Sequence, residues 1–205
     1  MTSIIPRYEY RIFGLNIQEV EEALRKQGQF EKERHISEIY LMTAGNTENN
    51  IKIRNRNLDI KVLVEQKDGL EQWKPFQVGE FPLQKEDLKH QVFPALGVEA
   101  PFFDRDVYTL EQFIKELVLD DPDIIVALTE KKRFGYSFNS CICEIAEVQI
   151  NGALLHTVAV ESEDPELVMQ SIKLLGLQNF ENVNYPKAIK RVLGLEINYD
   201  INKYF

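Results

Sequence analysis

Four short segments of this chain carry charged residues at every second position, with apolar residues on the opposite side of the repeat. Successive side chains of a β-strand point to opposite faces, so residues i and i+2 share a face. The segments are Arg7-x-Glu9-x-Arg11, Lys52-x-Arg54, Lys131-x-Arg133 and Glu161-x-Glu163. One such strand is simply half-solvated. Several of them together, basic and acidic, are also consistent with the lining of a closed barrel, whose ligand would then be a polyanion, with or without a metal.

The rest of the chain predicts an α+β fold with about eight strands, mostly antiparallel. Alternating apolar runs separated by turn residues predict strands over 6–13, 37–43, 51–55, 58–66, 124–136, 138–150 and 153–163, and the turn at Asp68-Gly69 leads into 70–76. Caps and a helical apolar repeat predict helices over 17–28, 84–91 and 108–119, after Asp164-Pro165 and after Tyr185-Pro186. The favoured turn pair Asn151-Gly152 joins the last two strands as a hairpin.

Length and charge narrow the class of protein. The 205 residues are enough for one domain, which we expect to span 1–205. No apolar run approaches the ~20 residues of a membrane helix, and the first residues lack a secretory signal pattern. The net charge of −9 disfavours a dedicated nucleic-acid binder. We therefore expect a cytoplasmic protein without nucleic-acid or membrane partners, and the sequence leaves its oligomeric state open.

The two cysteines fit the same picture. Cys141 and Cys143 are spaced i and i+2 on one expected strand, where two neighbours are a poor disulfide pair. They supply only half of a structural zinc site. We expect buried thiols in a reducing compartment.

Taken in order, the charged motifs resemble a known family. The matching segments are Arg7-Tyr8-Glu9-Tyr10-Arg11, Ser37-Glu38-Ile39-Tyr40-Leu41, Lys52-Ile53-Arg54, Asp59-Ile60-Lys61, Lys131-Lys132-Arg133, Glu161-Ser162-Glu163 and Asn184-Tyr185-Pro186-Lys187-Ala188. This ordered set resembles the CYTH domain, the superfamily of triphosphate tunnel metalloenzymes. The resemblance implies an antiparallel eight-stranded closed tunnel barrel with peripheral helices.

The resemblance also implies a ligand and a site. The ligand would be a triphosphate-containing small molecule or a polyphosphate, and the basic groups expected to grip it are Arg11, Lys52, Arg54, Lys61, Lys131 and Arg133. The carboxylates expected to hold Mg²⁺ or Mn²⁺ or to orient water are Glu9, Glu161, Glu163 and one of Glu144 or Glu147. Such a cation would neutralise developing charge during hydrolysis, as in a metal-dependent triphosphatase.

The opening motif departs from the family pattern. Arg7 stands where the family has its first Glu and Arg11 where it has Lys, so Glu9 is the only carboxylate left on that strand. Upstream of Glu161, the positions in the same phase are Ala159 and Thr157 rather than acids. This balance leaves two functions open: a metal-dependent triphosphatase, and a non-catalytic relative that binds an anion, a nucleotide or a partner.

Each assignment also has a structural alternative. The charges of the first strand and of the 51–66 hairpin are equally consistent with solvated strand faces and weak cross-strand ion pairs. Glu163 is equally consistent with a favourable position at the N-terminal end of the following helix. A plain structural domain of this kind would have no affinity for a polyanion.

Overall fold

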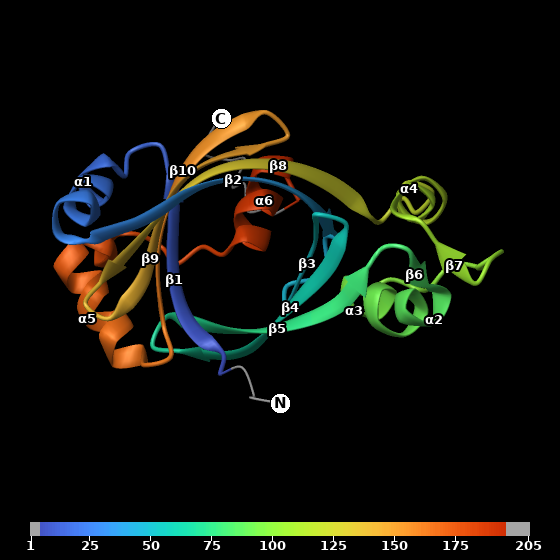
Figure 1. Cartoon of the computed structure of the whole chain (residues 1–205), viewed down its shortest axis with the longest axis horizontal. Coiled ribbons are helices and arrows are strands. Elements are labelled where there is room, and N and C mark those ends of the chain that lie inside the picture. The colour runs from blue at the N-terminus through green and yellow to red at the C-terminus, as the bar shows by residue number, and fades with distance from the viewer. Residues whose placement is uncertain (1–4, 196–205) are drawn as a thin grey trace, which may run out of the picture.

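Eight antiparallel strands close into a barrel in the computed structural model, which describes residues 5–195 (Figure 1). The strands are β1 (Arg7–Gly14), β2 (Gln29–Met42), β3 (Asn49–Arg54), β4 (Asn57–Lys67), β5 (Leu70–Glu80), β8 (Ile125–Phe138), β9 (Cys141–Ile150) and β10 (Ala153–Ser162). The expected closed antiparallel barrel is therefore confirmed. The two ends of the expected 1–205 domain lie outside the described residues.

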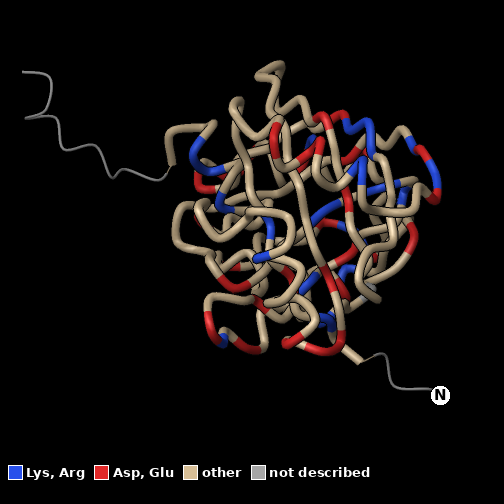
Figure 2. Tube along the Cα trace, turned by 90° about the vertical axis from the view of Figure 1, so that its left-hand side faces the viewer, with Lys and Arg blue, Asp and Glu red and all other residues tan. Residues whose placement is uncertain are grey.

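The barrel is closed by its first strand. The strands follow one another around the wall in the order β1-β10-β9-β8-β2-β3-β4-β5. β1 then completes the ring, because it pairs with β10 through Arg11 opposite Ala159 and with β5 through Arg7 opposite Trp73. Basic and acidic positions lie interspersed along the chain trace in Figure 2.

Four two-residue turns set the register of the hairpins. Their central residues have positive φ, and they are Asn55-Arg56, Asp68-Gly69, Asn139-Ser140 and Asn151-Gly152. Positive φ at both central positions matches the twist of the flanking strands, and Asn, Asp and Gly adopt it most readily. The predicted Asn151-Gly152 hairpin is confirmed, with Ala153 opposite Ile150.

Strand β2 is longer than the sequence pattern predicts. The expected strand began at residue 37, whereas β2 begins at Gln29. Residues 29–35 are exposed, and they read QFEKERH, without the alternation of a half-buried strand. The segment is extended because β8 pairs with it along its length, from Gln29 opposite Ser137 to Met42 opposite Ile125.

Two helices cover the outside of the barrel and a third closes one end of it. α1 (Gln18–Gln27) and α5 (Pro165–Leu175) pack their apolar faces, including Leu24 and Ile172, on outward residues of β1, β9 and β10. α6 (Tyr185–Leu193) follows the short helix η3 (Leu177–Asn179) and packs Ile189 against the inward-facing Tyr40 and Val148. No helix within residues 5–195 is long and apolar enough to cross a membrane.

A helical lobe is inserted between β5 and β8. It consists of β6 (Leu83–Gln84), α2 (Lys85–Asp87), η1 (Leu88–Val92), α3 (Phe93–Leu96), β7 (Val107–Tyr108), α4 (Leu110–Gln112) and η2 (Phe113–Val118). Its core packs against the outward apolar residues of β3 and β4, such as Ile51 and Ile60. The helical segment expected over 84–91 continues to Leu96. The helix expected over 108–119 begins after its N-cap Thr109, which forms the predicted capping box with Gln112. The lobe leaves the inside of the barrel free.

Candidate functional site

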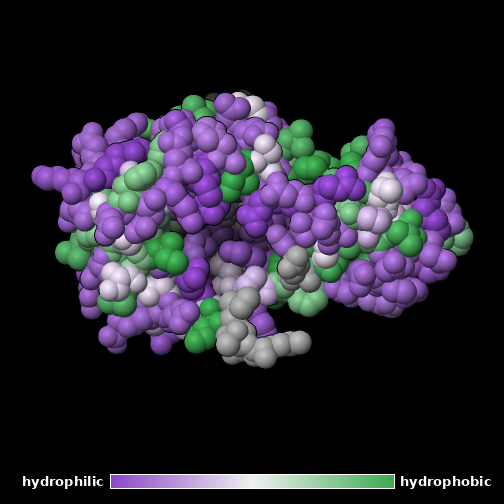
Figure 3. Space-filling view, in the orientation of Figure 1, coloured by the Kyte–Doolittle hydropathy of each residue, from purple (hydrophilic) through white to green (hydrophobic). Residues whose placement is uncertain are grey.

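A cavity of about 420 Å³ occupies the interior of the barrel. Figure 3 shows it as a hollow with a hydrophilic rim on the face seen in Figure 1. Its basic lining residues are Arg11, Lys52, Arg54, Lys61, Lys131 and Arg133, and its acidic ones are Glu9, Glu38, Asp59 and Glu161. All six predicted phosphate-binding residues thus line one cavity.

The period-two pattern explains this convergence. On β1, Glu9 and Arg11 point inward while Tyr10 and Ile12 pack beneath the outer helices. On β8, Lys131 and Arg133 line the cavity, whereas Lys132 is partly exposed and lies near the outer residue Glu33. Strand alternation therefore brings charges that are far apart in sequence to the same interior face.

The first charge cluster is centred on Arg11, which is buried. Its Nε donates to Glu9 Oε1 at 2.6 Å, and its Nη1 donates to Glu144 Oε1 at 3.0 Å. Nη1 also lies 3.3 Å from Thr157 Oγ1, and Nη2 lies 3.9 Å from Glu161 Oε1. The second oxygen of Glu144 accepts from Arg133 Nε at 2.5 Å. One guanidinium therefore joins acidic groups from β1, β9 and β10.

The second cluster is centred on Glu38 of β2, whose side chain is 1% exposed. It accepts from Lys131 Nζ at 2.5 Å and from Lys52 Nζ at 2.8 Å, and the guanidinium of Arg54 lies 3.6 Å away. The hydroxyl of Tyr40 donates to Glu38 at 3.2 Å and accepts from Lys131 at 2.7 Å. A single buried carboxylate thus holds cations from β3 and β8.

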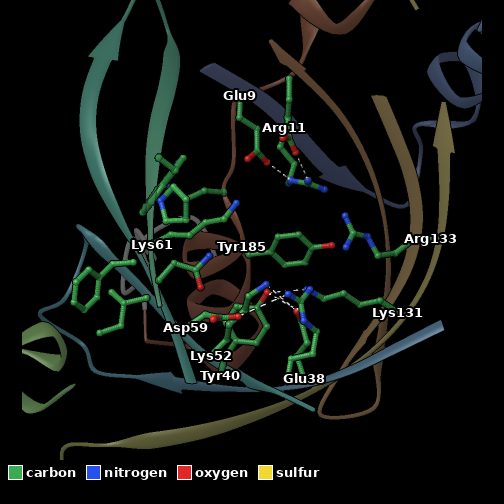
Figure 4. Close-up of a pocket in the computed structure, with 18 residues that line it drawn as sticks. Glu9, Arg11, Glu38, Tyr40, Lys52, Asp59, Lys61, Lys131, Arg133 and Tyr185 are labelled. Carbon is green, nitrogen blue, oxygen red and sulfur yellow. Dashed lines mark hydrogen bonds and ion pairs between the residues drawn. The ribbon is translucent and has the colours of Figure 1, made fainter. Parts of the chain in front are cut away.

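Tyr185, at the first turn of α6, lies between the two clusters in Figure 4. Asn184 caps the helix by accepting from Lys187 N at 2.8 Å, which fixes where Tyr185 enters the barrel. The ring centroid of Tyr185 lies 3.5 Å from Lys131 Nζ and 4.7 Å from Arg11 Cζ. Its buried hydroxyl has no hydrogen-bond partner among the described residues. A buried polar atom beside the cavity is therefore left without a hydrogen-bond partner in the described part of the chain.

Lys61 differs from the other lining cations. Among residues 5–195 no carboxylate lies within the 4 Å of an ion pair to it, although Figure 4 shows it directed into the cavity. The other five basic residues each contact at least one carboxylate. Lys61 is thus the cation that an incoming anion meets without displacing an internal partner.

The carboxylates of the first cluster have opposite pKa shifts. Burial raises the pKa of Glu9 and of Glu144, but nearby cations together outweigh it, Arg11 with Lys61 at Glu9 and Arg11 with Arg133 at Glu144, so both pKa values fall below normal. Burial, reinforced by the charge of Glu9, raises the pKa of Glu161, whose contacts to Arg11 and Arg7 are 3.9 and 3.8 Å. The pKa shifts differ in direction because the guanidinium of Arg11 lies close to Glu9 and Glu144 but farther from Glu161.

Burial also affects the second cluster. Burial and the charge of Lys52 lower the pKa of Lys131 to about 7, while the charge and hydrogen bond of Glu38 limit the shift. Burial raises the pKa of Glu38, but the charges of Lys131 and Lys52 outweigh it and hold that pKa well below the usual range. Lys131 is therefore the cavity cation most sensitive to pH near neutrality.

Two predicted metal ligands lie away from the cavity. Glu144 is buried next to Arg11, but Glu147, three residues later on β9, points to the opposite face and is exposed. Glu163 follows the end of β10, is exposed, and directly precedes the N-cap Asp164 of α5. Strand alternation and strand length thus remove both from the candidate site, and Glu144 is the one of the alternative pair that lies inside.

Four site residues were not assigned from the sequence: Glu38, Tyr40, Asp59 and Tyr185. The first two show the same period-two pattern, since Glu38 and Tyr40 face the cavity and alternate with Ile39 and Leu41, which face outward and pack against the helical lobe. A search for paired charges misses a single acid on a strand. Tyr185 shows no periodic pattern, because its place in the barrel depends on how α6 docks.

Comparison with known proteins agrees with this architecture. No family model and no curated protein matches the sequence. Among solved structures, the chain is similar to HpAC1 from Hippeastrum, a candidate adenylyl cyclase with a dominant triphosphatase activity. The two sequences are 16% identical, the structures superpose with a TM-score of 0.50, and the match covers 93% of this chain and 98% of that one. The chain is also similar to the PH1012 protein of Pyrococcus horikoshii, with 14% identity, a TM-score of 0.50 and coverage of 89% and 99%. The chain has the CYTH-like tunnel fold.

Proposed function

We propose that this protein binds the triphosphate group of a small molecule, or a short polyphosphate, in the barrel cavity. The observation that carries the proposal is the convergence of six basic side chains from β1, β3, β4 and β8 on one cavity. Ammonium and guanidinium groups form charge-assisted hydrogen bonds with phosphate oxygens, and guanidinium groups do so bidentately. An enclosed site strengthens these interactions because water screens them less.

The charge of the cavity favours an anion. Six basic and four acidic residues line it, so the lining is net positive inside a chain of net charge −9. Lys61 offers a charge without an ion-pair partner among the described residues. A triphosphate can therefore gain contacts in the cavity before any internal ion pair is broken.

The similarity to HpAC1 supports this ligand, since a triphosphatase of the same fold acts on such a group. We propose binding as the primary function rather than hydrolysis, because Arg11 and Arg133 already hold the carboxylates of Glu9 and Glu144. The Mg²⁺ or Mn²⁺ expected from the family resemblance stays a prediction. Triphosphate binding and phosphate release, each measured with EDTA, with Mg²⁺ and with Mn²⁺, show whether an ion takes part.

Isothermal titration calorimetry with inorganic triphosphate tests the proposal. We expect saturable binding that weakens with salt and becomes weaker for pyrophosphate and weaker still for phosphate, because shorter anions contact fewer cations. Lys61→Gln should reduce affinity about tenfold, on the order of 1.4 kcal/mol. The matched control Lys132→Gln changes a lysine on the outer side of the barrel and should leave affinity unchanged.

Two results would contradict the proposal. One is the absence of any heat or thermal shift with inorganic triphosphate and with ATP at millimolar concentration. The other is equal loss of affinity in Lys61→Gln and Lys132→Gln, which would place binding on the outer surface. Thermal stability of both variants in the absence of anion shows whether they are folded, since neither lysine is fully buried.

A further inference from the structure

We infer that the guanidinium of Arg11 takes the place of a divalent metal ion among the tunnel carboxylates, so that the protein binds its anion without a metal. The guanidinium lies among Glu9, Glu144 and Glu161, which come from three different strands. These are the only predicted metal ligands that the structure brings together. The inference deepens the proposed function and rests on it for the identity of the anion.

The contacts of Arg11 use the oxygens that a metal would need. Nε binds Glu9 Oε1 at 2.6 Å, Nη1 binds Glu144 Oε1 at 3.0 Å, and Nη2 faces Glu161 Oε1 at 3.9 Å. The remaining oxygen of Glu144 is bound by Arg133. Mg²⁺ and Mn²⁺ need carboxylate oxygens as direct ligands at about 2.1 Å. At Glu144 both oxygens already accept from an arginine.

The position of Arg11 is also fixed. Its side chain is 4% exposed, it packs over the ring of Tyr185 at 4.7 Å, and Thr157 Oγ1 accepts from it at 3.3 Å. An arginine is not deprotonated in proteins, so the charge cannot be removed to admit a cation. A divalent ion would have to displace a buried guanidinium and would then lie beside its positive charge. The site therefore disfavours metal ions electrostatically as well as sterically.

The rest of the described chain offers no replacement site. Residues 5–195 contain no group of three His, Cys, Asp or Glu side chains arranged to hold an ion, and Glu9, Glu144 and Glu161 around Arg11 are no exception. The two residues that would have enlarged the acidic cluster, Glu147 and Glu163, are exposed and lie away from the cavity. A metal requirement would thus have to come from the same three carboxylates that contact Arg11.

Mn²⁺ binding, measured by electron paramagnetic resonance of the free ion, tests the inference without any anion. Wild-type protein is expected to leave millimolar Mn²⁺ free. Arg11→Gln removes this guanidinium from the three carboxylates and leaves only one oxygen of Glu144 bound, by Arg133, so we expect it to bind Mn²⁺ at least tenfold more tightly and to melt at a higher temperature when the ion is present. Lys132→Gln is the control, since Lys132 lies on the outer side of β8 near Glu33, contacts none of the three carboxylates, and should leave Mn²⁺ binding at the wild-type level.

A second variant covers the case in which Arg11→Gln fails to fold. Arg11→Lys keeps one buried positive charge but has a single nitrogen where Arg11 contacts three acids, and we expect Mn²⁺ binding between those of the wild type and Arg11→Gln. Wild-type protein that binds Mn²⁺ as tightly as either variant would overturn the inference. So would wild-type binding of inorganic triphosphate that EDTA abolishes and Mn²⁺ restores.

These outcomes separate the inference from the proposed function. If the wild type binds no triphosphate under any condition, the proposed function fails. A gain of Mn²⁺ binding in Arg11→Gln would still support the role of Arg11. If the wild type binds triphosphate equally with EDTA and with Mn²⁺, both are supported.

Discussion

The ammonium of Lys131 lies 3.5 Å from the ring centroid of Tyr185, so a residue of β8 and a residue of α6 form a buried cation–π contact. The contact links the closing helix to the charged wall of the barrel. It also separates the cluster of Arg11 from that of Glu38, because the Tyr185 ring faces cations of both. Such a contact is worth about 2 kcal/mol when it is desolvated.

Substitution of Tyr185 should separate its ring from its hydroxyl. Tyr185→Phe keeps the ring and removes a buried hydroxyl that has no partner among the described residues, so the free energy of unfolding should stay equal or rise by about 1 kcal/mol. Tyr185→Leu loses the cation–π contacts and should lower it by about 2 kcal/mol. Urea unfolding measures both. A loss in Tyr185→Phe as large as that in Tyr185→Leu would mean that the hydroxyl has a structural partner.

The protonation of Lys131 should make anion binding depend on pH. Burial and the charge of Lys52 lower the pKa of Lys131 to about 7, against the effect of Glu38. Below this pH the side chain is charged and attracts phosphate, and above it the side chain becomes neutral, so its contribution to affinity is lost as pH rises. Calorimetric titrations between pH 6 and 8 should show this loss.

The ligand itself gains negative charge over the same pH range, so a variant is needed as the reference. Lys131→Arg stays charged at every pH in this interval. The affinity of the wild type relative to Lys131→Arg should therefore fall as pH rises from 6 to 8. A constant ratio would show that Lys131 does not titrate near neutrality.

Glu38→Gln should be strongly destabilising in the absence of ligand. It leaves the buried Lys131 and its neighbour Lys52 without their common carboxylate, and breaking a buried pair in this way costs about 3–5 kcal/mol. Glu147→Gln, on the exposed face of β9, is the control and should change stability by less than about 0.5 kcal/mol. Inorganic triphosphate should stabilise Glu38→Gln more than the wild type, because it replaces the lost negative charge. Equal stabilisation would place the ligand away from these lysines.

The two thiols should be unreactive in the folded protein. Cys141 and Cys143 are buried, and burial raises the pKa of Cys143 to about 12. The thiolate is the nucleophile, so native protein at pH 8 should not react with iodoacetamide, whereas protein unfolded in urea should be alkylated at both positions. Mass spectrometry counts the modified cysteines. Alkylation of Cys143 at the rate of a small-molecule thiol would contradict the described packing of β9.

Local patterns were sufficient to predict most strands and hairpins, whereas the closed eight-stranded barrel was implied by the resemblance of the ordered charged motifs to a known family. Asn151-Gly152 predicted its hairpin, and Arg7 to Arg11 predicted a strand with one charged face, because turn type and strand alternation depend only on neighbours in sequence. The exposed first half of β2 lacked such a pattern, and pairing with β8 determines its structure. Likewise Glu144 and Glu147 are both plausible from spacing alone, and only the registration of β9 distinguishes the inward residue from the outward one. Tyr185 depends on helix docking, for which the sequence contains no periodic indication.

The closure of the ring by β1 has a consequence for synthesis. β1 ends at Gly14, but its partner β10 begins only at Ala153, so the first strand made is among the last to be fully paired. At ribosomal elongation rates of about 5–20 residues per second, β1 waits on the order of ten seconds with one edge unpaired. An open strand edge is a template for association with other chains. The nascent protein is therefore most vulnerable to aggregation just before its last hairpin emerges, and a chain truncated before β10 would keep that edge permanently open.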